Sequence, residues 1–90
     1  NDVGSWTAAY DLGEKDPDGN VVRTEHLTTA DSENNLVFSE SGKMISLVGV
    51  EGLAVVETDD AILVCKLDEA QKVKDIVGEL NSKEELKKFL

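Results

Sequence analysis

The sequence predicts a mainly β fold with a helix at each end, and three observations lead to this prediction. From Leu36 to Cys65 the apolar residues come in short bursts of strand length, separated by Gly or Asp residues. From Val73 onward the apolar residues recur every three or four positions, which is typical of an amphipathic helix. Near the N-terminus, Ser5 precedes residues that tolerate a helix.

The N-terminal helix is expected to begin at Ser5 and to stop near Gly13. Ser5 is a favourable N-cap residue, and Trp6 and Tyr10 lie four positions apart, on one face of the helix. Two aromatic residues at this spacing pack in a core more often than they stack on a ligand. We therefore predict that both rings belong to the core, with ligand stacking as the alternative.

The middle of the chain is expected to be a series of short strands joined by turns. Residues 14–20 bring Pro, Asp, Gly and Asn together in the order of a tight turn. A first short strand is expected at 21–22, and residues 28–35 are polar enough to be a connection. The later apolar bursts are residues 36–38, 44–45, 47–50, 53–56 and 61–65. Short strands at nearly even intervals fit a meander, a small barrel or a coiled solenoid, and periodicity does not choose among them.

The C-terminal part is expected to be helical. Its apolar stripe consists of Val73, Ile76, Val77 and Leu80. Asp68 with Gln71 predicts a capping box at the start of this helix. Residues 81–82 interrupt the pattern, and Ser82 with Glu85 predicts a second short helix that runs through Leu86 and Phe89.

Composition limits the partners that this chain can have. Its 90 residues make one small domain at most, and 19 Asp and Glu against 9 Lys and Arg give a net charge of −10. Such a surface repels nucleic acid and anionic membranes, so we expect neither as a partner. Because Cys65 is the single cysteine and the chain opens on Asn1 without a leader-like segment, we expect a piece of a cytoplasmic protein.

Residues 14–25 partly match the EF-hand calcium loop, in which oxygen ligands alternate around a sharp Gly turn and a distant Glu. The matching residues are Glu14, Asp16, Asp18, Gly19, Val21 and Glu25. The first position holds Glu instead of the shorter Asp, and residues 26–30 would make a poor exiting helix. We therefore favour a solvated acidic turn. The alternative is an independent acidic binding module that binds calcium through residues 14–25.

The motifs predict no catalytic residue and no cofactor-binding residue in this chain. His26 is the single histidine, and no motif ties it to a nucleophile. Asp59 and Asp60 lie between two apolar bursts, where adjacent acids usually form a turn. The sequence contains neither a Gly-rich loop that runs into a helix nor a Gly-Lys-Ser/Thr motif. Nucleotide binding is therefore not predicted from residue spacing.

Several segments together resemble one enzyme family. Residues 2–6, followed by Ala9 and Tyr10, resemble the W-x-D-x-G-[ST]-W segment that closes the catalytic domain of mannose-1-phosphate guanylyltransferases. The first Trp of that motif would lie before residue 1. Further similar segments are residues 18–23, 48–53, 55–64 and 71–77. The resemblance covers roughly residues 2 to 80 in consistent order.

The resemblance implies a division of the chain into three parts. Residues 1–13 would be the end of a nucleotidyltransferase domain, residues 14–66 a short left-handed parallel β-helix, and residues 67–90 a C-terminal helical segment. The whole enzyme would join mannose 1-phosphate to GTP and release GDP-mannose and pyrophosphate with the help of magnesium. By the motif match, Asp2 would be a metal ligand, although we expect no useful metal affinity in this chain alone.

The resemblance also implies partners for this chain. We expect it to be a structural and assembly module that lacks catalysis and is completed by the missing N-terminal nucleotidyltransferase domain. The family uses this region in contacts between subunits, so a homo-oligomer through the β-helix is expected. A related nucleotidyltransferase that acts on another sugar or base is a further alternative.

Overall fold

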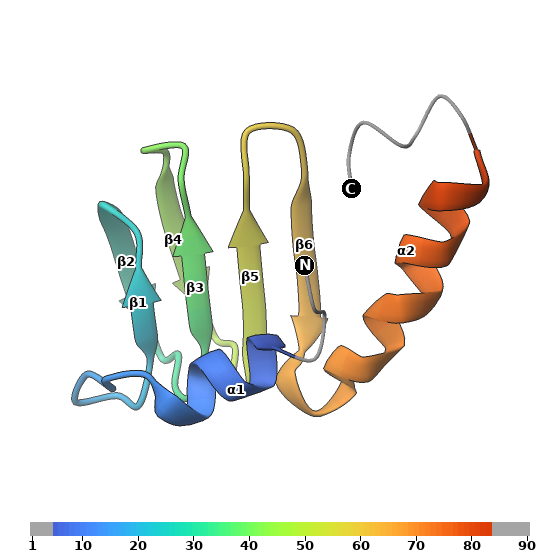
Figure 1. Ribbon diagram of the computed structural model, residues 1–90. Helices are drawn as coiled ribbons and strands as arrows, with labels where there is room; N and C mark the ends of the chain where they lie inside the picture. Colours follow the sequence, from blue (N-terminus) through green and yellow to red (C-terminus); the bar gives the residue numbers. More distant parts are fainter. Residues whose placement is uncertain (1–4, 84–90) are drawn as a thin grey trace.

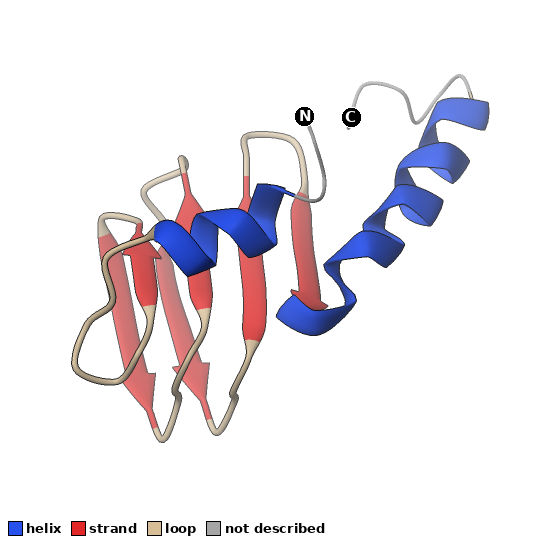
Figure 2. Ribbon diagram, turned by 60° about the horizontal axis from the view of Figure 1, so that its bottom comes forward, coloured by secondary structure: helices blue, strands red, loops and turns tan. Residues whose placement is uncertain are grey.

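In a computed structural model, which describes residues 5–83, short strands pass back and forth between two sheets and a helix covers the larger sheet (Figures 1 and 2). In chain order the elements are α1 (Ser5–Leu12), β1 (Val21–Arg23), β2 (His26–Ala30), β3 (Leu36–Ser39), β4 (Met44–Val48), β5 (Leu53–Glu57), β6 (Ile62–Lys66), η1 (Leu67–Lys72) and α2 (Val73–Ser82). The element η1 is a 3-10 helix. The predicted pattern of strands flanked by two helices is therefore confirmed.

The strands of residues 5–83 form a four-stranded sheet in the order β1-β3-β5-β6 and a two-stranded sheet of β2 and β4. In the larger sheet β1, β3 and β5 are parallel, with Val21 opposite Leu36 and Leu36 opposite Ala54. β2 and β4 are also parallel, with His26 opposite Met44. Since β1 to β5 alternate between the two sheets and pair in parallel, the fold is a β-helix, which is the coiled solenoid of the three predicted architectures. Its left-handed sense stays a prediction.

The last strand ends the coil by reversing its direction. β6 pairs antiparallel with β5, and Cys65 lies opposite Ala54. The Thr58 N–H donates to the Ala61 carbonyl (2.9 Å) and closes the turn between the two strands. Asp59 and Asp60 occupy this turn, as predicted. The strand expected at 61–65 therefore exists but lies outside the parallel stack.

The core lies between α1 and the larger sheet. Side chains on a strand alternate between its two faces, so residues in register line up on one face. The packed side chains are Trp6, Ala9 and Tyr10 from the helix and Val21, Leu36 and Ala54 from three adjacent strands. The centroids of the Trp6 and Phe38 rings lie 5.6 Å apart, and the planes of the two rings make an angle of 53°. The prediction that Trp6 and Tyr10 are core residues is confirmed.

Two predictions about connections are wrong. Residues 28–30, expected to begin a connection, are the second half of β2, because they pair in register with β4 and Thr is favoured in strands. Asp68 and Gln71 do not form a capping box, since η1 has Lys66 at its N-cap and no side-chain cap bond. Instead the Leu67 N–H donates to the Gly52 carbonyl (2.8 Å), so the chain turns directly from β6 into η1.

α2 is the predicted amphipathic helix, but it extends further than expected. Val73 is buried, Val77 is half-buried and Ile76 is 53% exposed. The helix continues through residues 81–82, and the Ser82 hydroxyl donates to the Glu79 carbonyl instead of interrupting it. The second helix, expected to open at Ser82 and to run through Leu86 and Phe89, falls on residues outside those described.

Candidate functional site

The acidic turn before β1 uses its central carboxylate to fold its own backbone. Asp16 Oδ1 accepts hydrogen bonds from the N–H groups of Asp18 and Asn20, each at 2.9 Å. The Gly19 N–H donates to the Asp16 carbonyl (2.8 Å), and Gly19 has a φ of 79°. Glycine adopts this conformation without the steric penalty that a side chain would bring. Asp16 therefore closes a turn in which its side chain bonds the backbone two residues ahead.

The calcium alternative is not supported by this geometry. Glu25 follows β1 while Asp16 precedes it, so the strand separates the two carboxylates. The Glu25 carboxylate instead lies 4.0 Å from Nε2 of His26. Among residues 5–83, no three His, Cys, Asp or Glu side chains are grouped so that they could hold a metal. The solvated acidic turn that we favoured from the sequence is confirmed for residues 14–19, and β1 follows it.

Two asparagines form a buried amide ladder, which we define as Asn20 and Asn35. They expose 1% and 0% of their surface and immediately precede β1 and β3. Asn20 Oδ1 accepts from the backbone N–H (2.8 Å) and the side-chain amide (3.1 Å) of Asn35. Asn35 Oδ1 in turn accepts from the Leu53 N–H (2.8 Å) at the start of β5. The ladder therefore joins the starts of three adjacent strands.

The same ladder also binds the loops that lead into these strands. The Asn20 side-chain amide donates to the Ser32 carbonyl (3.2 Å), and that of Asn35 donates to the Val50 carbonyl (3.3 Å). The Ser32 hydroxyl is itself bonded to the Ala30 carbonyl (3.0 Å). A buried polar group left without a partner costs free energy. The two amides can be buried because each of them has hydrogen-bond partners. The ladder is a structural element of the coil.

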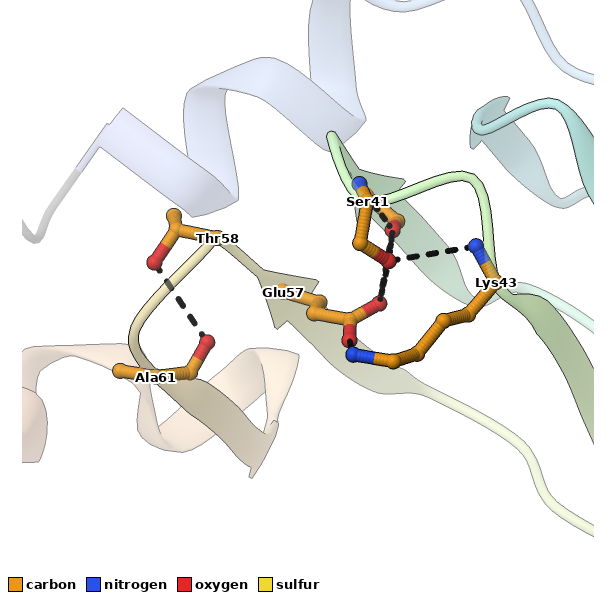
Figure 3. A network of polar contacts seen from close by, with 6 residues as sticks. Ser41, Lys43, Glu57, Thr58 and Ala61 are labelled. Atoms are coloured by element: carbon orange, nitrogen blue, oxygen red, sulfur yellow. Dashed lines mark hydrogen bonds and ion pairs between the residues drawn. The ribbon is translucent and has the colours of Figure 1, made fainter.

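A charged network lies at the opposite end of the strands, and we call its members Ser39, Ser41, Lys43 and Glu57 the Glu57 cluster (Figure 3). Glu57 ends β5 and exposes 4% of its surface. Its Oε1 accepts from the hydroxyls of Ser39 (2.8 Å) and Ser41 (2.7 Å). Its Oε2 lies 3.2 Å from Nζ of Lys43. The cluster thus connects the ends of β3 and β5 with the start of β4.

These contacts set the ionisation of the buried carboxyl. Hydrogen bonds from Ser41 and Ser39, with a smaller contribution from Lys43, hold the pKa of Glu57 below its ordinary value. Burial acts in the opposite direction, but the donors outweigh it because they bind the ionised form. Glu57 is therefore an ionised acceptor for its neighbours. Its two oxygens are already engaged by three side chains of the coil.

Two shallow hollows open on the part of the surface that the structure describes. The larger has a volume of about 260 Å³ and lies between β6 and the η1–α2 segment, with Val64, Cys65 and Ile76 among its lining residues. Burial raises the pKa of the Cys65 thiol, which makes it less reactive. At the rim, a hydrogen bond from Lys72 lowers the pKa of Glu69. This is a surface ion pair of the kind that adds little stability.

The residues singled out in the sequence do not come together in one site. His26 is on β2, Asp16 is before β1, and the Asp59–Asp60 turn follows β5. Asp2, the metal ligand that the resemblance implies, lies outside the described residues. The amide ladder and the Glu57 cluster instead connect successive turns, or rungs, of the β-helix.

The geometry agrees with the comparisons to known proteins. Residues 19–80 match the family model described as the MannoseP isomerase/GMP-like beta-helix domain. The chain belongs to this family. A solved structure from Thermus thermophilus, named mannose-1-phosphate geranyltransferase, matches with a TM-score of 0.72 and 31% identity over 90% of this chain and 24% of that chain.

Curated relatives of this β-helix domain are bacterial biosynthetic proteins. The mannose-1-phosphate guanylyltransferase of Escherichia coli is 38% identical over 81 residues, which cover 90% of this chain and 17% of that protein. The alginate biosynthesis protein AlgA of Pseudomonas aeruginosa is 43% identical over 82 residues, or 91% of this chain and 17% of that protein. The chain therefore spans about a sixth of the length of these relatives. Among the described residues no helix has the length and apolar character needed to cross a bilayer.

Neither polar system was predicted from the sequence. Asn20 was expected in a turn and Asn35 in a connection, yet both asparagines stand directly before an apolar pair, in Asn20-Val21-Val22 and Asn35-Leu36-Val37. That repeated position was a usable signal for a ladder between two rungs. No comparable repeat marks Glu57, because Ser39 is at the end of β3 and its other partners, Ser41 and Lys43, lie in the loop between β3 and β4.

Proposed function

We propose that this β-helix domain is a structural and assembly module of a mannose-1-phosphate guanylyltransferase and carries out no catalysis by itself. The whole protein would form GDP-mannose and pyrophosphate from GTP and mannose 1-phosphate. The support is the match of residues 19–80 to the family's β-helix domain, together with relatives that carry the guanylyltransferase name. The reaction then belongs to the part of those relatives that this chain does not cover.

The polar interior supports the same proposal. Asn20, Asn35 and Glu57 are buried among the described residues, and each is hydrogen-bonded to neighbouring turns of the β-helix. A group that binds a triphosphate must present free donors or a metal to it, and saturated groups cannot do so without breaking the coil. Such an interior suits a scaffold that holds its shape while a neighbouring domain moves or binds.

Other features of the whole enzyme are part of this proposal. Magnesium would be bound outside residues 5–83, with Asp2 as one ligand by family resemblance, and would neutralise charge on the phosphates. The protein would act in the cytoplasm, and the β-helix would take part in subunit contacts. Sedimentation of the whole protein over a range of concentrations would test the last point, since a monomer throughout would contradict it.

The test is an assay of GDP-mannose formation by two proteins, the 90-residue chain and the longer protein that contains it. We expect turnover with GTP, mannose 1-phosphate and magnesium only in the longer protein. Turnover by the chain alone would contradict the proposed division of labour. If the longer protein were active only with another sugar phosphate or nucleotide, the substrate assignment would be wrong. The proposed structural role of the β-helix domain would still be supported.

A further inference from the structure

Exposed apolar side chains gather around the hollow between β6 and α2, which stands beside β6 at the outer edge of the sheet (Figure 1). The walls of this hollow include Val64 and Cys65 from β6 and Ile76 from α2. Val64 and Ile76 are 58% and 53% exposed, and Ile62, which shares a face of β6 with Val64, is 67% exposed. These three are half of the six large apolar side chains that are exposed among the described residues. Such a grouping marks a surface that another group of atoms covers.

The hollow also borders the free edge of β6. In an antiparallel pair, the backbone groups of alternate residues point toward the neighbouring strand. The Ala61 carbonyl and the Leu67 N–H, which flank β6, both bond to the β5 side of the hairpin. The backbone groups of Ile62, Val64 and Lys66 therefore point away from β5, and no strand of residues 5–83 pairs with them. An open edge of this kind pairs readily with other chains, so proteins usually cover it.

The seven residues that follow Lys83 have an apolar side of their own. Lys83 ends α2 with an extended backbone, at φ −118° and ψ 120°, so the chain leaves the line of the helix there. Residues 84–90 lie outside the described residues, but their sequence places Leu86, Phe89 and Leu90 three and four positions apart. This spacing puts apolar side chains on one side of a helix. The sequence after α2 is therefore suited to packing against an apolar surface.

The length of this segment matches the distance that it has to cover. Ile76 lies six residues before Ser82, the last residue of α2, which is about 9 Å along the helix axis. A helix formed by residues 85–90 would also be about 9 Å long. Packed helices lie about 8–10 Å apart, a gap that three extended residues can span. A segment that turns back at Lys83 would therefore bring Phe89 level with Ile76.

We propose that residues 84–90 turn back along α2 and that Leu86 and Phe89 fill the hollow between α2 and β6. The segment would then be the cap that ends the β-helix, because it would cover the apolar face and the free edge of the last strand. Coiled repeat structures need terminal caps of this kind. This inference does not depend on the proposed function.

The native Cys65 reports on this contact, because it lines the hollow and is the single cysteine of the chain. In the whole protein, we would measure the rate at which N-ethylmaleimide labels Cys65, with peptide mapping to identify the site. The double change Leu86→Ser with Phe89→Ser should raise this rate by at least about fivefold, because it removes the cover. Lys87→Ser with Lys88→Ser is the matched control and should leave the rate within about twofold. Equal rates for the two double variants would overturn the proposal.

A crosslink tests the same contact by a gain of signal. A disulfide requires Cα atoms within about 7 Å of each other, so it forms only between positions that meet. On mild oxidation with oxidised glutathione, Phe89→Cys should form a disulfide with Cys65 of the same chain in much higher yield than Lys88→Cys. Equal yields would overturn the proposal. A disulfide that joins two chains, or labelling of Cys65 that speeds up on dilution, would identify a second copy as the cover and would also overturn it.

Discussion

The amide ladder and the Glu57 cluster join the same strands at their opposite ends, but they do so with different chemistry. The ladder is neutral, and its two amides act as donors and acceptors for three successive strands. The cluster is centred on one carboxylate, which binds Ser39, Ser41 and Lys43 more strongly when it is ionised. The stabilisation of the fold by the ladder should therefore be insensitive to pH and salt, while the stabilisation by the cluster should depend on both. Substitutions in the two systems should therefore differ in the size of their effect on stability and in its response to pH and salt.

The largest effect is expected from Asn35→Ala. The change removes acceptors and donors that bind Asn20, Val50 and Leu53, and it leaves polar groups in a fully buried place without partners. The free energy of unfolding should fall by about 3 kcal/mol, as for a buried network that loses its central member. Urea denaturation would measure this. Asn81→Ala, at an exposed position of α2, should stay within about 0.5 kcal/mol, and equal losses from the two changes would contradict the ladder's role.

Gly19→Ala should have the next largest effect on the same end of the coil. Gly19 has a φ of 79°, and an added Cβ would meet Oδ1 of Asn34. The expected loss of stability is about 1–2 kcal/mol. Gly78→Ala is the control, because Gly78 lies in α2 with open space around it and alanine favours a helix by about 1 kcal/mol. Thermal unfolding should therefore move in opposite directions for the two variants.

The Glu57 cluster should respond to acid. Because its contacts hold the pKa of Glu57 below the ordinary 4.5, the cluster stabilises the fold above that pH and loses this contribution as the pH falls through the lowered value. Glu57→Gln should lower the free energy of unfolding at neutral pH, by less than Asn35→Ala does. Below about pH 4.5 the variant should lose less additional stability than the unmodified protein does. Glu69→Gln removes an exposed carboxylate and should alter the acid limb less. If the stability of the unmodified protein and of Glu57→Gln fell identically with decreasing pH, the role of the cluster would be contradicted.

Lys43→Ala should have the smallest effect of the four. The Lys43 side chain is 71% exposed, and it contributes less to the ionisation of Glu57 than the two serines do. Its attraction to Glu57 is therefore screened by solvent and should vanish at about 1 M salt. Chemical denaturation at low and high salt would measure the difference. A loss at low salt as large as that from Asn35→Ala, absent at high salt, would show that the charge, and not the ladder, dominates.

The strands could be predicted from the sequence more easily than the way in which they pair. The strands between Leu36 and Cys65 were predictable because short apolar bursts with Gly and Asp between them are a local signal. The reversal of β6 was not, since parallel and antiparallel strands have the same local pattern and differ only in their partners. The resemblance supplied the β-helix, which periodicity had left open.

Both polar systems depend on contacts between rungs and were therefore harder to predict than the strands. Asn20 and Asn35 are fifteen residues apart in the chain, and the bond between their side chains requires the register of β1 and β3. Asp16, in contrast, bonds only residues up to four positions away, so its turn was predictable. The candidate calcium loop failed for a related reason, because the strand between Asp16 and Glu25 was not part of the loop pattern.

The central claim is that this domain supports catalysis without taking part in it, and one measurement tests it most directly. The kcat for GDP-mannose formation and the thermal midpoint of the whole protein would be measured for Asn35→Ala and for the unmodified protein, well below both midpoints. We expect a midpoint that falls by several degrees with a kcat that stays within about twofold. A kcat that collapses while the midpoint stays unchanged would place the ladder in the chemistry and would contradict this account.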